Sequence, residues 1–255
     1  MKNTTALSLA ALVTLAATPS LAQTALPYDW SLTGNAGLFT DYRFRGISQT
    51  NRKPALQGGV DLAHKSGFYV GNWNSNVDAA MYTGANLEMD FYGGFKGAFD
   101  AFTYDIGVLY YYYPGSGAGG TTKIDNTEIY VAGGWGPFSL KYSHAVSDFF
   151  SATDSKGAYY IDGTVTYPLT KEIALIGHVG YQGGLKNGAR LTEIDGSGPH
   201  TSITDWKLGA TYDLSGWILG AAYIGTDKKL TAGVASVEGR NISGDTLLLS
   251  VTKSF

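Results

Sequence analysis

Apolar and polar side chains alternate along almost the whole chain, and the C-terminal segment shows the pattern most clearly. One face of this segment is apolar and consists of Leu247, Leu249, Val251 and Phe255. The other face is polar and consists of Thr246, Ser250, Thr252 and Ser254. The alternation predicts a β-strand between an apolar and a polar environment. A terminal aromatic residue behind such a strand is typical of bacterial outer-membrane barrels, whose outer face meets lipid. Lys253 departs from the apolar pattern, but its long stem can carry the ammonium group to the lipid headgroups.

The alternation recurs in twelve segments and predicts an all-β fold, a transmembrane antiparallel up-and-down barrel. These segments are 31–45, 55–64, 68–76, 86–96, 101–113, 127–135, 138–147, 158–167, 173–181, 202–214, 217–225 and 245–255. Five connections are tight, at 65–67, 97–100, 136–137, 168–172 and 215–216. Six are longer, at 46–54, 77–85, 114–126, 148–157, 182–201 and 226–244. Long and short alternate, so we expect the long connections outside the cell and both chain ends on the periplasmic side.

Aromatic residues gather near the strand ends and predict two interfacial belts. The set near the short connections is Trp30, Phe68, Tyr69, Phe99, Phe102, Trp135, Phe138, Tyr167, Tyr212, Trp217 and Phe255. The set toward the long connections is Tyr42, Phe44, Trp73, Tyr110, Tyr112, Tyr159, Tyr181 and Tyr223. The alternative is that strands of any β protein are rich in aromatic residues.

The N-terminus has the features of a secretory signal. Lys2 precedes an apolar core at 6–17, and Ser20 to Ala22 form a small-residue cleavage site. We therefore expect a signal peptide at 1–22 and one barrel domain at 23–255. The chain has no cysteine, so its stability does not depend on disulfides. Its net charge is −3, and loss of Lys2 makes it −4; this mild acidity argues against a nucleic-acid partner, which a basic face would bind.

Charged residues fall on the face opposite the apolar one. An Arg or Lys on the lipid face costs about 2–4 kcal/mol at the bilayer midplane, so the charged face must line the lumen. In the first predicted strand, Tyr42 and Phe44 then face lipid while Arg43 and Arg45 face inward. The candidate pore-lining residues are Asp41, Arg43, Arg45, Asp61, Glu88, Asp90, Asp105, Lys141, Asp205 and Lys207; Glu128 and Asp162 share their orientation.

We expect these charges to form a constriction with a transverse field. Arg43 and Arg45 would be its cationic side. Its anionic side would comprise Asp41, Glu88, Asp90 and Asp105. The alternative is that the charges pair across a narrow lumen and fill it. Barrels of eight strands are filled and barrels of 16–18 strands hold open channels, so twelve strands leave both outcomes open.

Sites for catalysis or cofactors are weakly supported. Ser143 and His144 are adjacent in a strand, so their side chains point to opposite faces and cannot form a nucleophile–base pair. The remaining histidines, His64, His178 and His200, show no metal-ligand spacing. The glycine-rich stretch 115–120 is followed by no helix and lacks the architecture of a phosphate loop. We predict no enzyme activity, no metal and no cofactor.

Several segments carry a family resemblance. They are Asp41–Thr50 (DYRFRGISQT), Pro54–Gly59, Gly67–Val77 (GFYVGNWNSNV), Glu88–Gly94 (EMDFYGG) and Lys141–His144 (KYSH). The chain resembles the proteobacterial TorF-type porin-like proteins, whose domain is called Gcw_chp. The resemblance covers nearly all of the chain after the signal. It implies an outer-membrane barrel and supplies no catalytic residue.

The favoured hypothesis is a Gram-negative outer-membrane porin for passive diffusion of small hydrophilic solutes or ions. One rival is a structural or adhesive barrel with a filled lumen; another is a lipid- or peptide-hydrolysing barrel enzyme. Expected partners are outer-membrane lipids and lipopolysaccharide, the solutes, and the barrel-insertion machinery through Phe255. The oligomeric state, a homo-oligomer included, stays open.

Overall fold

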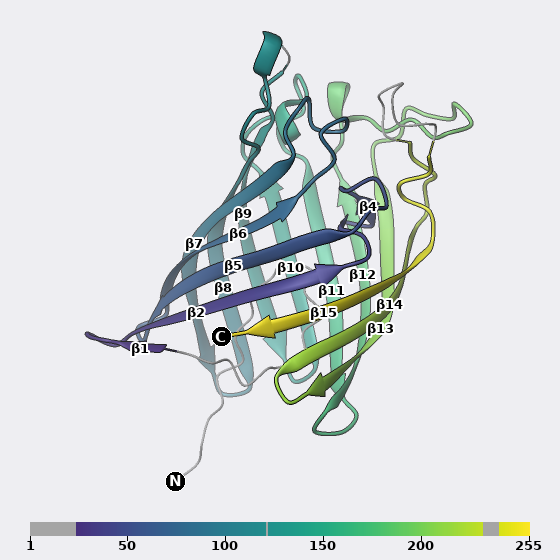
Figure 1. Ribbon diagram of the computed structural model, residues 1–255. Helices are drawn as coiled ribbons and strands as arrows, with labels where there is room; N and C mark the ends of the chain where they lie inside the picture. The colour runs from purple at the N-terminus through teal and green to yellow at the C-terminus, as the bar shows by residue number, and fades with distance from the viewer. Residues whose placement is uncertain (1–23, 121, 232–239) are drawn as a thin grey trace.

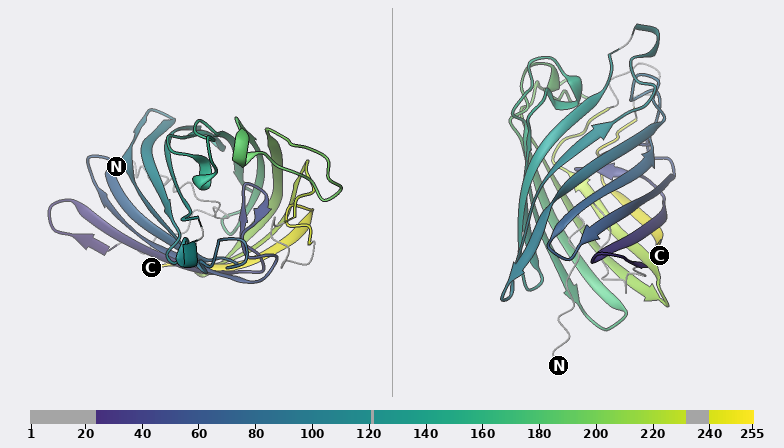
Figure 2. Two further views of the ribbon diagram at one scale, coloured as in Figure 1. Left: turned by 90° about the horizontal axis from the view of Figure 1, so that it is seen from above. Right: turned by 90° about the vertical axis from the view of Figure 1, so that its left-hand side faces the viewer.

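The structure is a computed structural model that describes residues 24–120, 122–231 and 240–255. The expected signal peptide at 1–22 lies outside the described residues. Figure 1 shows long strands that wrap around a common axis, and the view along that axis in Figure 2 shows the ring they form.

Twelve antiparallel strands form the closed barrel, as the alternation predicted. They are β2 (Trp30–Phe39), β5 (Ala55–His64), β6 (Phe68–Asn76), β7 (Leu87–Phe99), β8 (Phe102–Tyr112), β9 (Asp125–Trp135), β10 (Phe138–Ala145), β11 (Tyr159–Pro168), β12 (Ile173–Gly183), β13 (Ile203–Leu214), β14 (Trp217–Thr226) and β15 (Thr246–Ser254). Each strand pairs with the next in this order, and β15 pairs with β2 to close the ring. Eleven strands agree with their predicted bounds within three residues.

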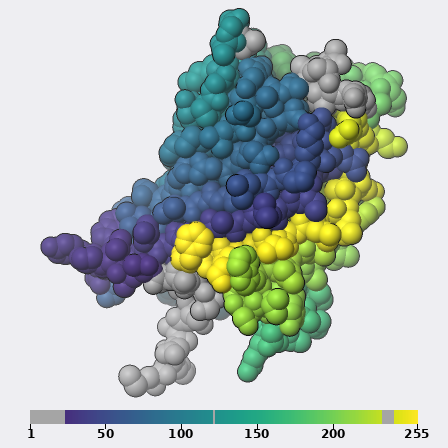
Figure 3. All heavy atoms as spheres, in the orientation of Figure 1, coloured from purple at the N-terminus to yellow at the C-terminus, as the bar shows by residue number. Residues whose placement is uncertain are grey.

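The seam between β15 and β2 is the shortest ladder of the twelve-stranded ring, with five residue pairs from Ser250↔Phe39 to Ser254↔Asn35. Phe255 extends it, because its backbone exchanges hydrogen bonds of 2.6 and 2.9 Å with Gly34. Figure 3 shows β15 (yellow) lying directly against β2 (purple) on the barrel surface. Below the seam, the free edge of β2 pairs with a short additional strand, β1 (Thr24–Leu26). Phe255 therefore lengthens the closing ladder through its backbone.

The connections alternate in length as expected. Tight turns join β5 to β6, β7 to β8, β9 to β10, β11 to β12, and β13 to β14, and the C-terminus lies at their end of the barrel (Figure 1). The long connections contain three short 3₁₀ turns, η1 (Ala118–Gly120), η2 (Phe149–Ser151) and η3 (Asn187–Ala189). Among the described residues, no helix has the length and apolar character to cross a membrane.

The outer wall is apolar. Exposed side chains on it include Leu38, Leu56, Val70, Val131, Leu208 and Leu249, and an aromatic group near the tight turns includes Phe68, Phe102, Trp135, Phe138 and Trp217. Two belt assignments on the wall strands were wrong: the side chains of Tyr69 and Trp73, 8% and 5% exposed, point into the barrel. Two more, Tyr42 and Phe44, lie on a loop inside the lumen. Lys253 faces outward, and its Nζ lies 4.8 Å from the Trp217 ring.

Glycine and tyrosine complement each other on the inner wall. The Tyr160 ring lies against Gly180 and the Tyr130 ring against Gly107, each on a neighbouring strand, where a Cβ would collide with the tyrosine. A ring thus fills the gap that a missing side chain leaves. This packing accounts for part of the high content of glycine and tyrosine, 35 and 18 residues.

The first predicted strand, 31–45, ends early. β2 stops at Phe39, and residues 40–54, which we call loop 1, follow it. Loop 1 contains the small hairpin of β3 (Arg43–Phe44) and β4 (Ile47–Ser48). Arg45 and Gly46 take positive φ angles of 48° and 78° to make its turn. The chain therefore turns away from the wall six residues earlier than its alternation suggests.

Candidate functional site

Loop 1 folds back into the lumen near the long-connection end of the barrel. Figure 2, viewed along the axis, shows the β3–β4 hairpin inside the ring of strands. Its buried polar side chains include Asp41, Arg43, Arg45, Ser48 and Thr50. Asp41, Arg43 and Arg45 thus lie inside the barrel, but on a loop rather than on the wall.

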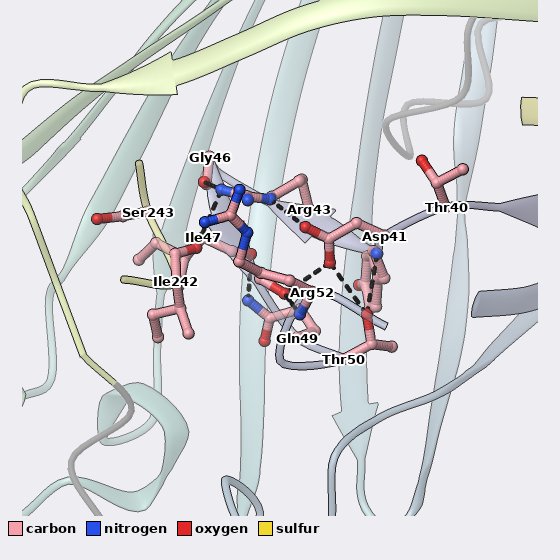
Figure 4. Close-up of polar contacts among 12 residues, drawn as sticks. Thr40, Asp41, Arg43, Gly46, Ile47, Gln49, Thr50, Arg52, Ile242 and Ser243 are labelled. Atoms are coloured by element: carbon pink, nitrogen blue, oxygen red, sulfur yellow. Dashed lines mark hydrogen bonds and ion pairs between the residues drawn. The ribbon is translucent and has the colours of Figure 1, made fainter. Parts of the chain in front are cut away.

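Asp41 organises the loop from within. Its carboxylate accepts hydrogen bonds from Arg43 Nε at 2.6 Å, Ser48 Oγ at 2.6 Å and Thr50 Oγ1 at 3.0 Å (Figure 4). A carboxylate that accepts several short bonds holds its donors in one geometry. The expectation that Asp41 and Arg43 lie on opposite sides of a constriction is therefore wrong, because the two form one ion pair.

Arg43 also ties loop 1 to the connection between β14 and β15. Its Nη1 donates to the carbonyl oxygens of Gly46 and Ile242, each at 3.0 Å, and of Gly244 at 3.2 Å. The Ser48 amide donates to the same Ile242 oxygen at 2.8 Å. The second terminal nitrogen of Arg43, Nη2, is buried without a hydrogen-bond partner among the described residues.

Arg45 reaches the opposite wall. Its Nη2 donates to both carboxylate oxygens of Glu128 on β9, at 2.9 and 2.7 Å, and its Nη1 donates to Gln182 Oε1 on β12. The guanidinium carbon also lies 4.5 Å from the ring centre of Tyr160 on β11. One side chain thus connects loop 1 to three strands, and a bidentate pair of this kind is geometrically specific.

The aromatic residues of loop 1 complete the contact with the wall. Tyr42 donates to Glu88 Oε1 at 3.1 Å, and its ring meets the edge of Trp73 with 5.4 Å between centres. The Phe44 ring packs on Tyr111, with 5.7 Å between centres. The prediction that Tyr42 and Phe44 face lipid is wrong, because both sides of the hairpin contact the lumen wall.

Gly46 allows loop 1 to approach the wall on its other side. A Cβ at this position would collide with Thr226 on β14 and lie 2.7 Å from the Cβ of Asp205 on β13. Its positive φ also favours glycine. Both the turn and the close approach therefore depend on this residue.

Two carboxylates near Tyr42 form no ion pair with the arginines of loop 1, so the alternative of pairing across the lumen does not hold for them. Glu88 and Asp90 are 1% and 0% exposed, and both oxygens of Asp90 lack a hydrogen-bond partner in the part of the chain that the structure describes. Neither forms an ion pair with Arg43 or Arg45 in the structure. The Arg45 guanidinium pairs with Glu128 instead. Glu88 and Asp90 therefore lie in a low-dielectric environment without an arginine partner from loop 1.

The remaining candidate residues line the lumen below loop 1 and contact mainly tyrosines. Asp105 accepts a bond of 2.6 Å from Tyr69, Asp61 accepts one of 2.7 Å from Tyr92, and Lys141 Nζ lies 4.1 Å from the Tyr130 ring centre. Their inward orientation matches the alternation. Whether they line an open pore stays a prediction.

His178 joins this network although its sequence spacing suggested no site. Its Nε2 lies 2.9 Å from Asp205 Oδ1, and its Nδ1 lies 3.5 Å from Asp162 Oδ1. Tyr160 donates to the other Asp205 oxygen at 2.9 Å. Within the described ranges, no cluster of three or more acidic, histidine or cysteine side chains fits a metal ion.

A small cavity of about 20 Å³ separates loop 1 from the wall formed by β13, β14, β15, β2 and β5. Its polar lining consists of Asp41, Arg43, Gln57 and Lys207, and its apolar lining consists of Phe39, Tyr42, Ala222, Ile224 and Leu248. Loop 1 therefore leaves a small space beside Arg43, although Gly46 packs closely on β13 and β14.

The chain matches a known protein family over nearly its whole length. Residues 22–255 match the family described as bacterial protein of unknown function (Gcw_chp). The chain belongs to this family. The family resemblance seen in the sequence is thereby confirmed, whereas the TorF-type name is not. No curated protein matches the chain.

Solved structures share the fold of this Gcw_chp protein at low sequence identity. The NanC porin has a TM-score of 0.56 at 13% identity, with 88% of this chain and 98% of that chain covered. The KdgM porin has a TM-score of 0.54 at 10% identity, with 88% and 99% covered. A KdgM porin in complex with disordered oligogalacturonate has a TM-score of 0.51 at 9% identity, with 88% and 98% covered. The fold is therefore that of porin barrels.

Proposed function

We propose that this Gcw_chp protein is an outer-membrane channel for passive diffusion of small hydrophilic solutes or ions, with loop 1 as its constriction. The observation that carries the proposal is a closed barrel with an apolar outer wall and a charged loop folded into its lumen. An apolar wall suits lipid, and charged groups in the lumen select among polar solutes. We also propose that the protein is of the TorF type, as the resemblance carried by Asp41–Thr50 implies.

The likeness to porin barrels supports the same function and the outer-membrane location. The covered fraction of the KdgM and NanC chains is nearly complete, so the match concerns the whole barrel. Catalysis has no comparable support: Ser143 is buried on the inner face, and His144 bonds instead to Tyr142 at 3.0 Å. We propose no enzymatic role.

A filled structural barrel is the second candidate, because loop 1 is buried and leaves a cavity of only about 20 Å³ beside it. Ion conductance of the purified protein in planar bilayers separates the two candidates. Residues 43–52 lie outside the twelve wall strands, so we expect a variant in which two glycines replace them to keep the wall. We expect measurable conductance from the native protein and larger conductance from this variant.

The outcomes of this experiment are distinct. If the native protein is silent and the shortened variant conducts, loop 1 is a plug and the native barrel is closed. If neither conducts while both remain folded barrels by circular dichroism, the diffusion function is wrong and a structural role is favoured.

A further inference from the structure

The cavity beside loop 1 has the features of an anion-binding subsite. Arg43 lines it from loop 1, Lys207 from β13 and Gln57 from β5, so polar side chains that carry donor groups line it from three elements. Asp41 is the one carboxylate in its lining. Figure 4 shows Arg43 and Asp41 side by side, with the guanidinium directed toward Ile242.

Arg43 has one donor group to spare. Its side chain is 1% exposed, Nε is bonded to Asp41, and Nη1 is bonded to three carbonyl oxygens. Nη2 has no partner within the described residues, although it belongs to a buried, permanently charged group. Leaving such a donor unpaired is costly, and a cavity lined by the same side chain is the place where an acceptor would relieve that cost.

The charge at the cavity favours an anion over a neutral acceptor. Arg43 and Lys207 supply two positive charges and Asp41 supplies one negative charge, which leaves one net positive charge at the lining. Asp162 and Asp205 attract Lys207 from outside the lining, and both also face His178, at 3.5 and 2.9 Å. Because most of the wall is apolar, the attraction for an anion is screened far less than in water.

The size of the cavity limits the ligand. About 20 Å³ of water-sized space holds a single small group. We propose that the cavity binds one small monovalent anionic group, either a free halide or the carboxylate of a solute. As a statement about transport, this inference rests on the proposed channel function and assigns acidic solutes as its substrate class. As a statement about binding, it stands without conduction.

Thermal unfolding of the detergent-solubilised protein measures binding without transport. A ligand of the folded state raises the unfolding midpoint. We expect chloride and acetate, at equal ionic strength, to raise the midpoint of the native protein relative to benzenesulfonate, which is too large for the cavity. The rise should disappear in Arg43→Gln and in Lys207→Met. The second variant keeps every hydrogen bond that loop 1 makes to Ile242 and Gly244.

Arg52→Gln is the matched control, because Arg52 lies in the same loop but is exposed and does not line the cavity. It should respond to the anions as the native protein does. Anomalous diffraction from bromide-soaked crystals should show a peak beside Arg43 Nη2 that is absent in Lys207→Met.

Two results would overturn the subsite. One is an unfolding midpoint that is the same in chloride, acetate and benzenesulfonate. The other is a bromide-soaked crystal in which the cavity shows no bromide peak and holds only water. Chloride and acetate acting alike indicates a shared anionic site; a response to acetate alone assigns it to carboxylates. An anion response in a protein that does not conduct would refute the channel and leave the subsite standing.

Discussion

Arg45→Ala tests whether the contact between Arg45 and Glu128 holds loop 1 in the lumen. The substitution removes two hydrogen bonds to Glu128, one to Gln182 and the stacking over Tyr160. Glu128 is 2% exposed and would retain only the Tyr111 hydroxyl at 3.3 Å and the Asn126 amide at 3.2 Å. A buried carboxylate would then lose its bidentate ion-pair partner and keep only the longer-range attraction of Lys141.

Removing one partner of a buried ion pair costs about 3–5 kcal/mol. The wall ladders do not depend on Arg45, so the cost falls on the in-folded position of loop 1. Since about 1.4 kcal/mol corresponds to a factor of ten in an equilibrium, the lower value shifts the balance between in-folded and released loop by about a hundredfold. We expect a conductance several times that of the native protein.

Single-channel recording measures the conductance, and thiol labelling measures the position of the loop. The chain has no cysteine, so Ile47→Cys introduces one reporter in loop 1. Labelling should be slow in the native background and fast with Arg45→Ala. The double variant Arg45→Ala/Glu128→Gln removes the unpaired charge and should restore part of the slow labelling.

Arg52→Ala is the control, because within the described residues the Arg52 side chain reaches outside loop 1 only through a 3.4 Å contact with Asn241 O at the surface. It should leave conductance and labelling unchanged. If Arg45→Ala also leaves both unchanged, the contact with Glu128 does not hold the loop, and the site is wrongly assigned.

Three further predictions follow from particular residues. Gly46→Ala should release loop 1 and raise conductance, because its Cβ collides with Thr226; labelling at position 47 checks this, and unchanged labelling would refute it. Deletion of Phe255, which bonds to Gly34 and ends the closing ladder, should lower the amount of protein in the outer membrane while inserted barrels conduct normally; equal membrane levels would remove the insertion role. Burial raises the pKa of Asp78, but hydrogen bonds from Lys53 and the Ala80 amide outweigh it and hold the pKa below its ordinary value. The contact of Asp78 with loop 1 is then complete at neutral pH and lost only as the pH falls through that lowered pKa; Asp78→Asn should reproduce the acid state in limited proteolysis at pH 7, and an unchanged digestion pattern would contradict this.

Much of the wall could be predicted from the sequence, because the signal for a barrel strand is local. Leu247, Leu249 and Val251 face outward in the structure as their alternation indicates. Side chains alternate between the two faces of a strand, so the sequence alone indicates which environment each face contacts. Distant residues do not need to be known for this inference. The lengths of the connections likewise indicated the up-and-down order.

The path of loop 1 could not be predicted in this way. Polar and aromatic residues alternate through Asp41 to Arg45 just as they do in a wall strand. Inside the lumen, however, aromatic rings find inner-wall tyrosines and carboxylates to pack against, so an aromatic residue does not need lipid. Alternation alone cannot distinguish a strand in the wall from a hairpin inside the barrel.

The partners of the charged residues were decided by the closed ring. Arg45 lies 83 residues before Glu128 and 137 before Gln182. Barrel closure brings β9 and β12 to the same level of the lumen, where a loop following β2 can reach both. The sequence by itself determined which faces of the strands are apolar and which charges are turned from lipid. Only the tertiary structure decided which of those charges meet, because ion pairs in a lumen depend on distances across the ring and not along the chain.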